Sequence, residues 1–214
     1  MQEVFVLSGT DQPAMVMEYL DGMSLGRVLR LSEGPLSVDV TARVLLPITS
    51  ALRAAHAAGV VHRDLKPDNV FLVGAPPSMV EPHVKVLDFG LAKLTAREGA
   101  FASTAQLTRT GYVLGTPHYM APEQVGERPQ IDVRTDVWAL GSIAYECLAG
   151  RRAVEGRSIS EVLRAIVQAP IAPLDQLAPW APRPVTMLVG RMLSRSQADR
   201  PTLLEVHETL SAWA

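Results

Sequence analysis

Two aspartates, a lysine and an asparagine are spaced in this sequence so that together they could transfer a phosphoryl group. Asp64, Lys66 and Asn69 lie within the run His-Arg-Asp-Leu-Lys-Pro-Asp-Asn, and Asp88 opens the triplet Asp-Phe-Gly. Phosphoryl transfer needs a group that orients the attacking hydroxyl, a cation near the transferred phosphate, and metal ions that neutralise the phosphate oxygens. Asp64 is the predicted base and Lys66 the predicted cation. Asn69 and Asp88 carry the hard oxygen ligands that Mg²⁺ prefers, so we predict them as metal ligands.

The order of the motifs distinguishes a catalytic site from a polar surface loop. Most aspartates and lysines in proteins are exposed and take no part in chemistry, so a solvated loop is the simplest alternative for residues 62–69. A single Asp-Phe-Gly would be a weak signal. Here that triplet follows His-Arg-Asp, and Ala-Pro-Glu, ending at Glu123, follows both. Three motifs in one fixed order favour the catalytic interpretation.

The composition limits the kind of partner. The chain has 214 residues, of which 48% are hydrophobic, and a net charge of -2, which suits one globular domain. It has no basic block, so we expect no nucleic-acid partner. The longest apolar run, residues 137–148, is far shorter than the roughly 20 residues of a bilayer span, so we expect no membrane span within this chain. A single cysteine, Cys147, fits a reducing compartment. We predict a cytoplasmic location, which leaves room for a membrane anchor outside this chain.

Hydrophobic periodicity predicts the strands that must hold these residues. Residues 4–7 and 14–19 have strand patterns and are separated by turn-prone residues, which predicts a β-hairpin. Two further strands are predicted at residues 70–73 and 84–87, each beside one of the candidate metal ligands.

Helical patterns dominate the rest of the chain. Residues 37–58 carry apolar side chains at steps of three or four, and Gly59 provides a stop. Residues 135–149 are apolar nearly all round, which predicts a helix buried at the centre of the domain. Two pairs have the spacing of a capping box, namely Ser158 with Glu161 and Thr202 with Glu205.

Together these motifs resemble the C-terminal lobe of the eukaryotic-like Ser/Thr protein kinases of the kind found in bacteria. The resemblance covers nearly the whole chain and implies an α+β, protein-kinase-like fold that is mainly helical. It implies residual N-terminal-lobe strands and a hinge at residues 1–20, and the C-terminal lobe at residues 21–214. Within that lobe, the catalytic loop is residues 62–69 and the activation segment is residues 88–123.

The resemblance also implies the reaction and its acceptor. The pair Lys66-Pro67 and the segment Gly-Thr-Pro-His-Tyr-Met at residues 115–120 imply a Ser/Thr acceptor rather than Tyr. Thr116 is expected to hydrogen-bond toward Asp64 and Lys66, which adds it to the catalytic residues. Residues 114–117 are expected to shape the pocket for the residue that follows the acceptor. The implied cofactors are ATP and Mg²⁺, and the implied partners are proteins that bear Ser or Thr.

Nucleotide binding is implied for the hinge and the catalytic loop. Met17 is the implied gatekeeper, and the backbone of Glu18 and Leu20 is expected to meet the adenine. Phe71 is expected to lie under the adenine ring. Plain core packing would explain Met17 and Phe71 equally well. The implied set of nucleotide-binding residues is Met17, Glu18, Leu20, Lys66, Asn69, Phe71 and Asp88.

Two structural contacts follow from the same resemblance. Glu123 is expected to pair with Arg200, because buried charges need partners. Asp136, at the start of the predicted central helix, is expected to hold the backbone of the turn formed by His62 and Arg63.

A regulatory site is implied next to Asp64. In family members with an arginine at the position of Arg63, this side chain receives a phosphate on the activation segment. Thr108 and Thr110 are the predicted phosphate acceptors, and an unmodified threonine-rich loop is the alternative. Residues 95–109 are small and polar, so we expect this segment to be mobile until a contact holds it.

The family pattern is incomplete in this sequence. A glycine-rich loop and a strand lysine that holds the α and β phosphates are not found before the catalytic loop. The two strands predicted at residues 4–19 would be marginal alone and would have an unpaired edge, so self-association is also predicted.

Three interpretations remain open on the sequence alone. One is a truncated Ser/Thr kinase that is weak or inactive in isolation. Another is a catalytically silent, kinase-like binding or regulatory module. The third is a different phosphotransferase, which the segment Gly-Thr-Pro-His-Tyr-Met-Ala-Pro-Glu disfavours.

Overall fold

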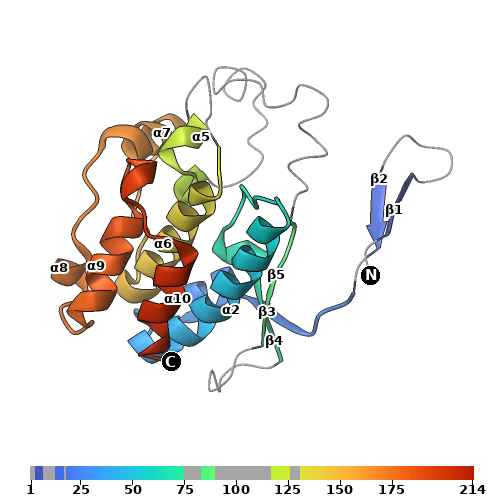
Figure 1. The fold of residues 1–214 in the computed structure, drawn as a ribbon, viewed down its shortest axis with the longest axis horizontal. Helices are drawn as coiled ribbons and strands as arrows, with labels where there is room; N and C mark the ends of the chain where they lie inside the picture. The colour runs from blue at the N-terminus through green and yellow to red at the C-terminus, as the bar shows by residue number, and fades with distance from the viewer. Residues whose placement is uncertain (1–2, 7–12, 17, 75–82, 90–116, 126–130) are drawn as a thin grey trace.

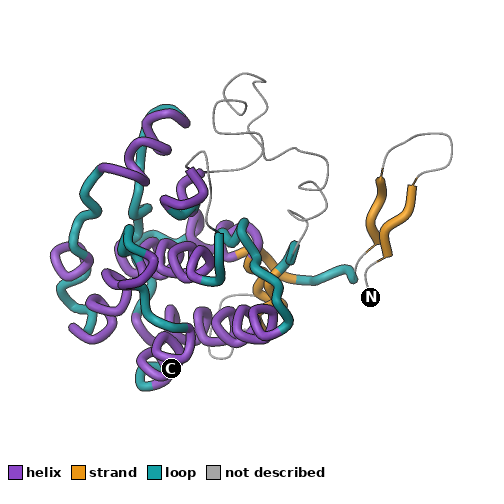
Figure 2. Tube along the Cα trace, turned by 45° about the horizontal axis from the view of Figure 1, so that its top comes forward, coloured by secondary structure: helices purple, strands orange, loops and turns teal. Residues whose placement is uncertain are grey.

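The N-terminal strands form a hairpin. The computed structural model describes residues 3–6, 13–16, 18–74, 83–89, 117–125 and 131–214. Strands β1 (Glu3–Val6) and β2 (Pro13–Val16) are antiparallel partners. In both views the hairpin lies apart from the helical body, to which residues 18–21 lead (Figure 1, Figure 2). The predicted hairpin is confirmed. Its second strand was predicted too long, because residues 18–21 form no strand.

A second sheet supports the candidate site. β3 (Gly22–Ser24), β4 (Val70–Val73) and β5 (His83–Val86) are antiparallel in the order β3-β4-β5. The two predicted strands are confirmed as β4 and β5, with β5 shifted one residue toward the N-terminus. β3 was not predicted, because three residues are too few to show periodicity. Its Gly22 has a φ of 147°, and a Cβ there would lie 2.0 Å from the carbonyl oxygen of Leu72.

Helices make up most of the described chain and lie to one side of this sheet (Figure 1). The α-helices are α1 (Leu25–Leu31), α2 (Val38–Ala57), α5 (Pro122–Val125), α6 (Arg134–Ala149), α7 (Ile159–Gln168), α8 (Leu174–Leu177), α9 (Arg183–Met192) and α10 (Leu203–Ser211). The 3-10 helices are η1 (Pro67–Asn69), η2 (Pro117–Tyr119) and η3 (Gln197–Asp199). The chain therefore has the mainly helical α+β fold that was predicted.

Helix α6 is the centre of the core, as predicted. It packs against both α2 and α9, and Trp138, Leu140 and Ile143 on it are fully buried. Burying side chains of this size contributes about 1.5–3 kcal/mol each. The contact with α9 is close, because a Cβ at Gly141 would lie 2.6 Å from the Cβ of Met192.

The helix ends follow local chemistry. Helix α2 ends as predicted, and Gly59 beyond it has a φ of 71°, in the left-handed region. The capping box of Thr202 and Glu205 is complete. The box predicted at Ser158 is only half formed, because the Glu161 carboxylate accepts from the backbone N–H of Arg157 instead. None of the helices in the described ranges combines the length and the apolar surface that crossing a bilayer requires.

Candidate active site

The structure brings Asp64, Lys66 and Asn69 together. They lie on the turn between α2 and β4, and η1 supplies Asn69. Lys66 donates from Nζ to Asp64 Oδ2 at 2.7 Å. Asn69 donates from Nδ2 to the Asp64 carbonyl oxygen at 2.8 Å and to Asp64 Oδ2 at 3.3 Å. The base, the cation and one metal ligand predicted from the sequence therefore form one hydrogen-bonded group.

These contacts also determine which atoms face outward. Both hydrogens of the Asn69 amide go to Asp64, so Oδ1 is the Asn69 atom that could coordinate a metal. Lys66 and Asn69 both bind Asp64 Oδ2, so Oδ1 is the carboxylate oxygen that could accept a hydroxyl proton. Asn69 is buried and Asp64 is exposed. The predicted metal ligand is thus fixed by packing, while the predicted base is open to solvent.

His62 links the base to the second predicted metal ligand. Its ring is fully buried, and Nε2 lies 2.9 Å from the carbonyl oxygen of Leu87. Because a carbonyl only accepts, Nε2 carries the proton, and Nδ1 accepts from the backbone N–H of Asp64 at 3.3 Å. The ring also packs on Phe89, with 4.8 Å between centroids. His62 was predicted only as part of a motif. Its hydrogen bonds to Asp64 and to Leu87, the residue before Asp88, were not predicted.

Asp88 lies two residues after the end of β5 and has an unusual backbone conformation. Its φ is 63°, which few residues other than glycine adopt. The backbone N–H of Leu87 donates to the carbonyl oxygen of Asn69 at 2.8 Å. This bond ties the chain segments that carry the two predicted metal ligands. Left-handed residues of this kind persist only where surrounding contacts hold them.

Asp136 holds the catalytic turn, as the sequence predicted. It is fully buried at the start of α6 and accepts from the backbone N–H of His62 and of Arg63, each at 2.9 Å. It also lies 2.7 Å from Nε2 of His56, on the last turn of α2. The contact of His56 with Asp136 was not predicted. Arg63 has a φ of 68°, so Asp136 stabilises a strained turn.

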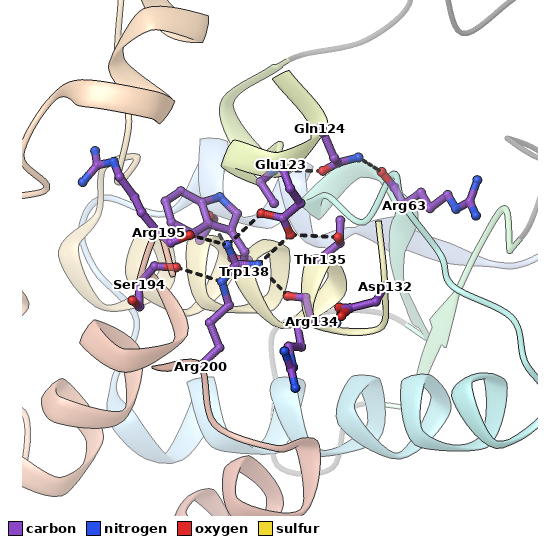
Figure 3. Close-up of polar contacts among 12 residues, drawn as sticks. Arg63, Glu123, Gln124, Asp132, Arg134, Thr135, Trp138, Ser194, Arg195 and Arg200 are labelled. Carbon is purple, nitrogen blue, oxygen red and sulfur yellow. Dashed lines mark hydrogen bonds and ion pairs between the residues drawn. The ribbon is translucent and has the colours of Figure 1, made fainter. Parts of the chain in front are cut away.

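Glu123 and Arg200 form the predicted ion pair (Figure 3). Arg200 donates from Nη1 and Nη2 to the two carboxylate oxygens of Glu123 at 2.7 and 2.8 Å. Thr135 donates to the same carboxylate at 2.8 Å. Burial disfavours ionisation of Glu123, but hydrogen bonds, first that from Arg200, outweigh it and lower the pKa of this carboxyl. The guanidinium also lies 5.3 Å from the ring centroid of Trp138 on α6.

The implied nucleotide end is more exposed. Lys85 on β5 donates to Glu18 at 2.6 Å, and this hydrogen bond with the charge of Lys85 lowers the pKa of the Glu18 carboxyl. Leu20 and Phe71 are partly buried. The Glu18 contact was not predicted. The partial burial of Phe71 is compatible with adenine stacking and with core packing, so both interpretations stand.

The sequence of this chain is similar to those of known proteins. The protein kinase domain family matches residues 3–211. The chain belongs to this family. It is 41% identical over 189 residues to the serine/threonine-protein kinase Pkn1 of Myxococcus xanthus, which is 88% of this chain and 26% of that protein. Identity to PkaA of Streptomyces coelicolor is 40% over 190 residues, 88% of this chain and 32% of that one.

A relative with lower identity is matched over the same share of this chain. The serine/threonine-protein kinase PknL of Mycobacterium tuberculosis is 34% identical over 188 residues, 88% of this chain and 43% of that protein. The chain thus spans from about a quarter to two fifths of the length of these relatives. The resemblance inferred from the motifs is confirmed.

The donor atoms of this kinase chain fit Mg²⁺ bound with ATP. Asn69 Oδ1 and the carboxylate of Asp88 are hard oxygen ligands, and the family uses ATP with a divalent metal. Within the described ranges, no group of three or more His, Cys, Asp or Glu could hold a metal alone. Two ligands suffice for Mg²⁺ when phosphate and water oxygens complete its shell.

Four of the predicted site residues lie outside the described part of the chain: Met17, Thr108, Thr110 and Thr116. Arg63, the predicted phosphate receptor, is described. Its side chain points away from the Glu123–Arg200 pair, and its Nε is buried with no hydrogen-bond partner within the described ranges (Figure 3).

Proposed function

We propose that this chain transfers the γ-phosphate of ATP, bound with Mg²⁺, to Ser or Thr of protein substrates in the cytoplasm. The observation that supports this most is the hydrogen-bonded group of Asp64, Lys66 and Asn69. A binding module would have no use for a base, a cation and a metal ligand held together in one hydrogen-bonded group.

Each residue then has a role in the transfer. The substrate hydroxyl oxygen bonds to the γ-phosphorus, and the bond from that phosphorus to the bridging oxygen of ADP breaks. Asp64 accepts the hydroxyl proton at Oδ1, and Lys66 stabilises the charge on the transferred group. Asn69 and Asp88 would hold Mg²⁺, which neutralises phosphate oxygens when bound. Asp136 and His62 keep these groups in place.

Phosphate transfer from Mg-ATP to a Ser-containing peptide tests this proposal. Asp64→Asn removes the base and should lower the rate about 100-fold or more, since general base catalysis typically contributes about 10²–10⁴-fold. Asp175→Asn, an exposed aspartate on α8, is the matched control and should leave the rate unchanged. Equal rates for the two variants would refute the assigned role of Asp64.

We further propose that the chain is weak in isolation. The family uses a strand lysine to hold the α and β phosphates. Among the described lysines, Lys66 pairs with Asp64 and Lys85 pairs with Glu18. This observation also favours a second candidate, a catalytically silent kinase-like module. ATP binding by calorimetry without detectable transfer would support that candidate, and transfer that Asp64→Asn abolishes would exclude it.

Regulation and assembly complete the proposal. A phosphate on Thr108 or Thr110 would bind Arg63, whose Nε is buried without a partner in the described part of the chain. Phosphopeptide mapping of active protein that finds neither threonine modified would remove this idea. The outer edges of the β1–β2 hairpin pair with no other strand in the described ranges, so they would support self-association, which analytical ultracentrifugation measures. The boundary between the residual N-terminal-lobe strands with the hinge, residues 1–20, and the C-terminal lobe, residues 21–214, stays a prediction.

A further inference from the structure

His118 reaches out of its own segment to a distant part of the fold. It lies in η2, two residues after Thr116, and its Nδ1 is 3.0 Å from the carbonyl oxygen of Val154. Val154 is buried in the connection between α6 and α7. Because the carbonyl only accepts, Nδ1 carries the proton and donates. One side chain thus ties the segment that follows Thr116 to the body of the domain.

A second side chain of η2 makes a parallel contact. Tyr119 donates to Glu146 Oε2 on α6 at 2.5 Å, and Glu146 lies 3.9 Å from Nε of Arg152. Burial, followed by the charge of Glu146, raises the pKa of Tyr119 far above its ordinary value. The Tyr119 hydroxyl therefore stays protonated at any pH at which the protein is folded. The histidine contact is the one of the two that can change with pH.

The surroundings of His118 favour its neutral form. Its ring lines an open hollow of about 760 Å³. The charged residues around that hollow are Arg151, Arg152 and Arg157, with Glu146, Glu155 and Glu161. Burial, and to a smaller extent Arg152, lowers the pKa of His118 below 6.5, against the Val154 carbonyl and Glu155, which favour the charged form.

We propose that His118 is a positioning residue, which holds the substrate-facing end of the activation segment against the α6–α7 connection and so sets the affinity for the protein substrate. This inference rests on the proposed kinase function. η2 packs against both α6 and α7, so loss of the tether loosens the segment locally while the buried core stays intact. Within the described ranges, His118 shares no hydrogen-bond partner with the group around Asp64, so we expect the affinity for nucleotide to be independent of His118.

The sign of the pH effect follows from the fold's preference for neutral His118. A histidine whose pKa is lowered on folding contributes its full stabilisation above its ordinary value of 6.5. That contribution is lost as the pH falls below 6.5, because the unfolded segment then binds the proton more readily. Affinity for the substrate should therefore weaken toward acid pH.

Two substitutions separate the effect of the hydrogen bond to Val154 from the effect of protonating the imidazole ring. His118→Ala removes the donor, and the KM for a Ser-containing peptide should rise about fivefold, the factor that one hydrogen bond is worth, with the KM for ATP unchanged. His118→Asn keeps an N–H donor near the position of Nδ1 and does not titrate. It should restore most of the affinity and abolish the rise in KM between about pH 7.5 and about pH 5.5. His207→Ala, on α10 away from the site, is the control.

Direct peptide binding keeps this inference apart from the proposed function. Fluorescence anisotropy measures peptide affinity without phosphate transfer. If the wild type transfers phosphate and His118→Ala binds peptide as tightly as wild type, the inference is wrong. If the wild type binds peptide but transfers nothing, the proposed function is wrong and the two His118 variants still decide the inference. If the wild type neither binds peptide nor transfers phosphate, hydrogen exchange of the backbone amides of residues 118–121 tests the inference. Equal protection in His118→Ala and His118→Asn would overturn the tether.

Discussion

The two ends of the candidate site are built in different ways. At the catalytic-loop end, Asp136 and Arg200 are buried and each makes several hydrogen bonds, so the turn that carries Asp64 is fixed from the core. At the end where we propose nucleotide binding, named the nucleotide end, the side chain of Glu18 is 63% exposed, and its ion pair with Lys85 joins residues 18–21 to the sheet.

The two ends should therefore contribute differently to the free energy of unfolding. Buried polar groups that lose a partner leave an uncompensated charge, which costs several kcal/mol. Exposed ion pairs contribute about 0–1 kcal/mol and many contribute nothing measurable. The catalytic end is therefore preorganised by the folded core, and the nucleotide end depends on contacts that the core does not supply. Substitutions at the two ends should differ accordingly.

Glu123→Ala should have the largest effect. It leaves the fully buried guanidinium of Arg200 without its carboxylate, which should destabilise the protein by about 3–5 kcal/mol. At about 2–4 °C per kcal/mol for a domain of this size, the melting temperature should fall by about 10 °C. Glu208→Ala, an exposed glutamate on α10, is the control. A fall below about 2 °C would contradict the structural role of the pair.

The same pair should respond to acid. The pKa of Glu123 is lowered from its ordinary value of 4.5 in the folded protein. Its stabilisation is therefore present above pH 4.5 and is lost as the pH falls through the lowered pKa. Melting curves of wild type and Glu123→Ala should converge toward low pH, and a constant difference between them would show that the charge is not responsible.

Gly141→Ala should have a smaller effect on the same end of the site. The new Cβ would lie 2.6 Å from the Cβ of Met192, so α6 and α9 would have to separate, at a cost of about 1–3 kcal/mol. Gly190→Ala is a matched control, because it adds the same methyl group to α9 with no atom within 4 Å. It should stabilise α9 by up to about 1 kcal/mol through helix propensity. Equal melting temperatures for the two variants would show that α6 is packed more loosely than the structure indicates.

The sequence predicted which catalytic-loop residues lie together better than the packing that supports them. Motif order grouped Asp64, Lys66 and Asn69, because phosphoryl transfer restricts the residue types and their spacing, and the structure brings the three into one hydrogen-bonded group. Their catalytic roles stay predictions. Apolar periodicity identified α2 and α6, because a continuous buried stripe leaves a regular pattern. Both signals are local in the chain. The structure confirms α2 and α6 as helices, and it confirms that Asp64, Lys66 and Asn69 are in contact.

Contacts between distant segments were harder to predict. His56 meets Asp136 only because of the angle at which α2 crosses α6, and periodicity gives a face but no crossing angle. Strand β3 was missed because three residues show no pattern. The contact of Lys85 with Glu18 depends on how residues 18–21 pass the sheet, which no local signal contains.

Lys85→Gln should have the smallest effect, and it tests the nucleotide end directly. It removes the charge that faces Glu18, yet the melting temperature should change by less than about 1 °C, because the pair is exposed. The pKa of Glu18, lowered mainly by the Lys85 hydrogen bond, should return toward 4.5, which carboxyl NMR titration measures. Hydrogen exchange of residues 18–21 should become faster. If the melting temperature fell by more than about 4 °C instead, the nucleotide end would be held as firmly as the catalytic loop, and the contrast between the two ends would fail.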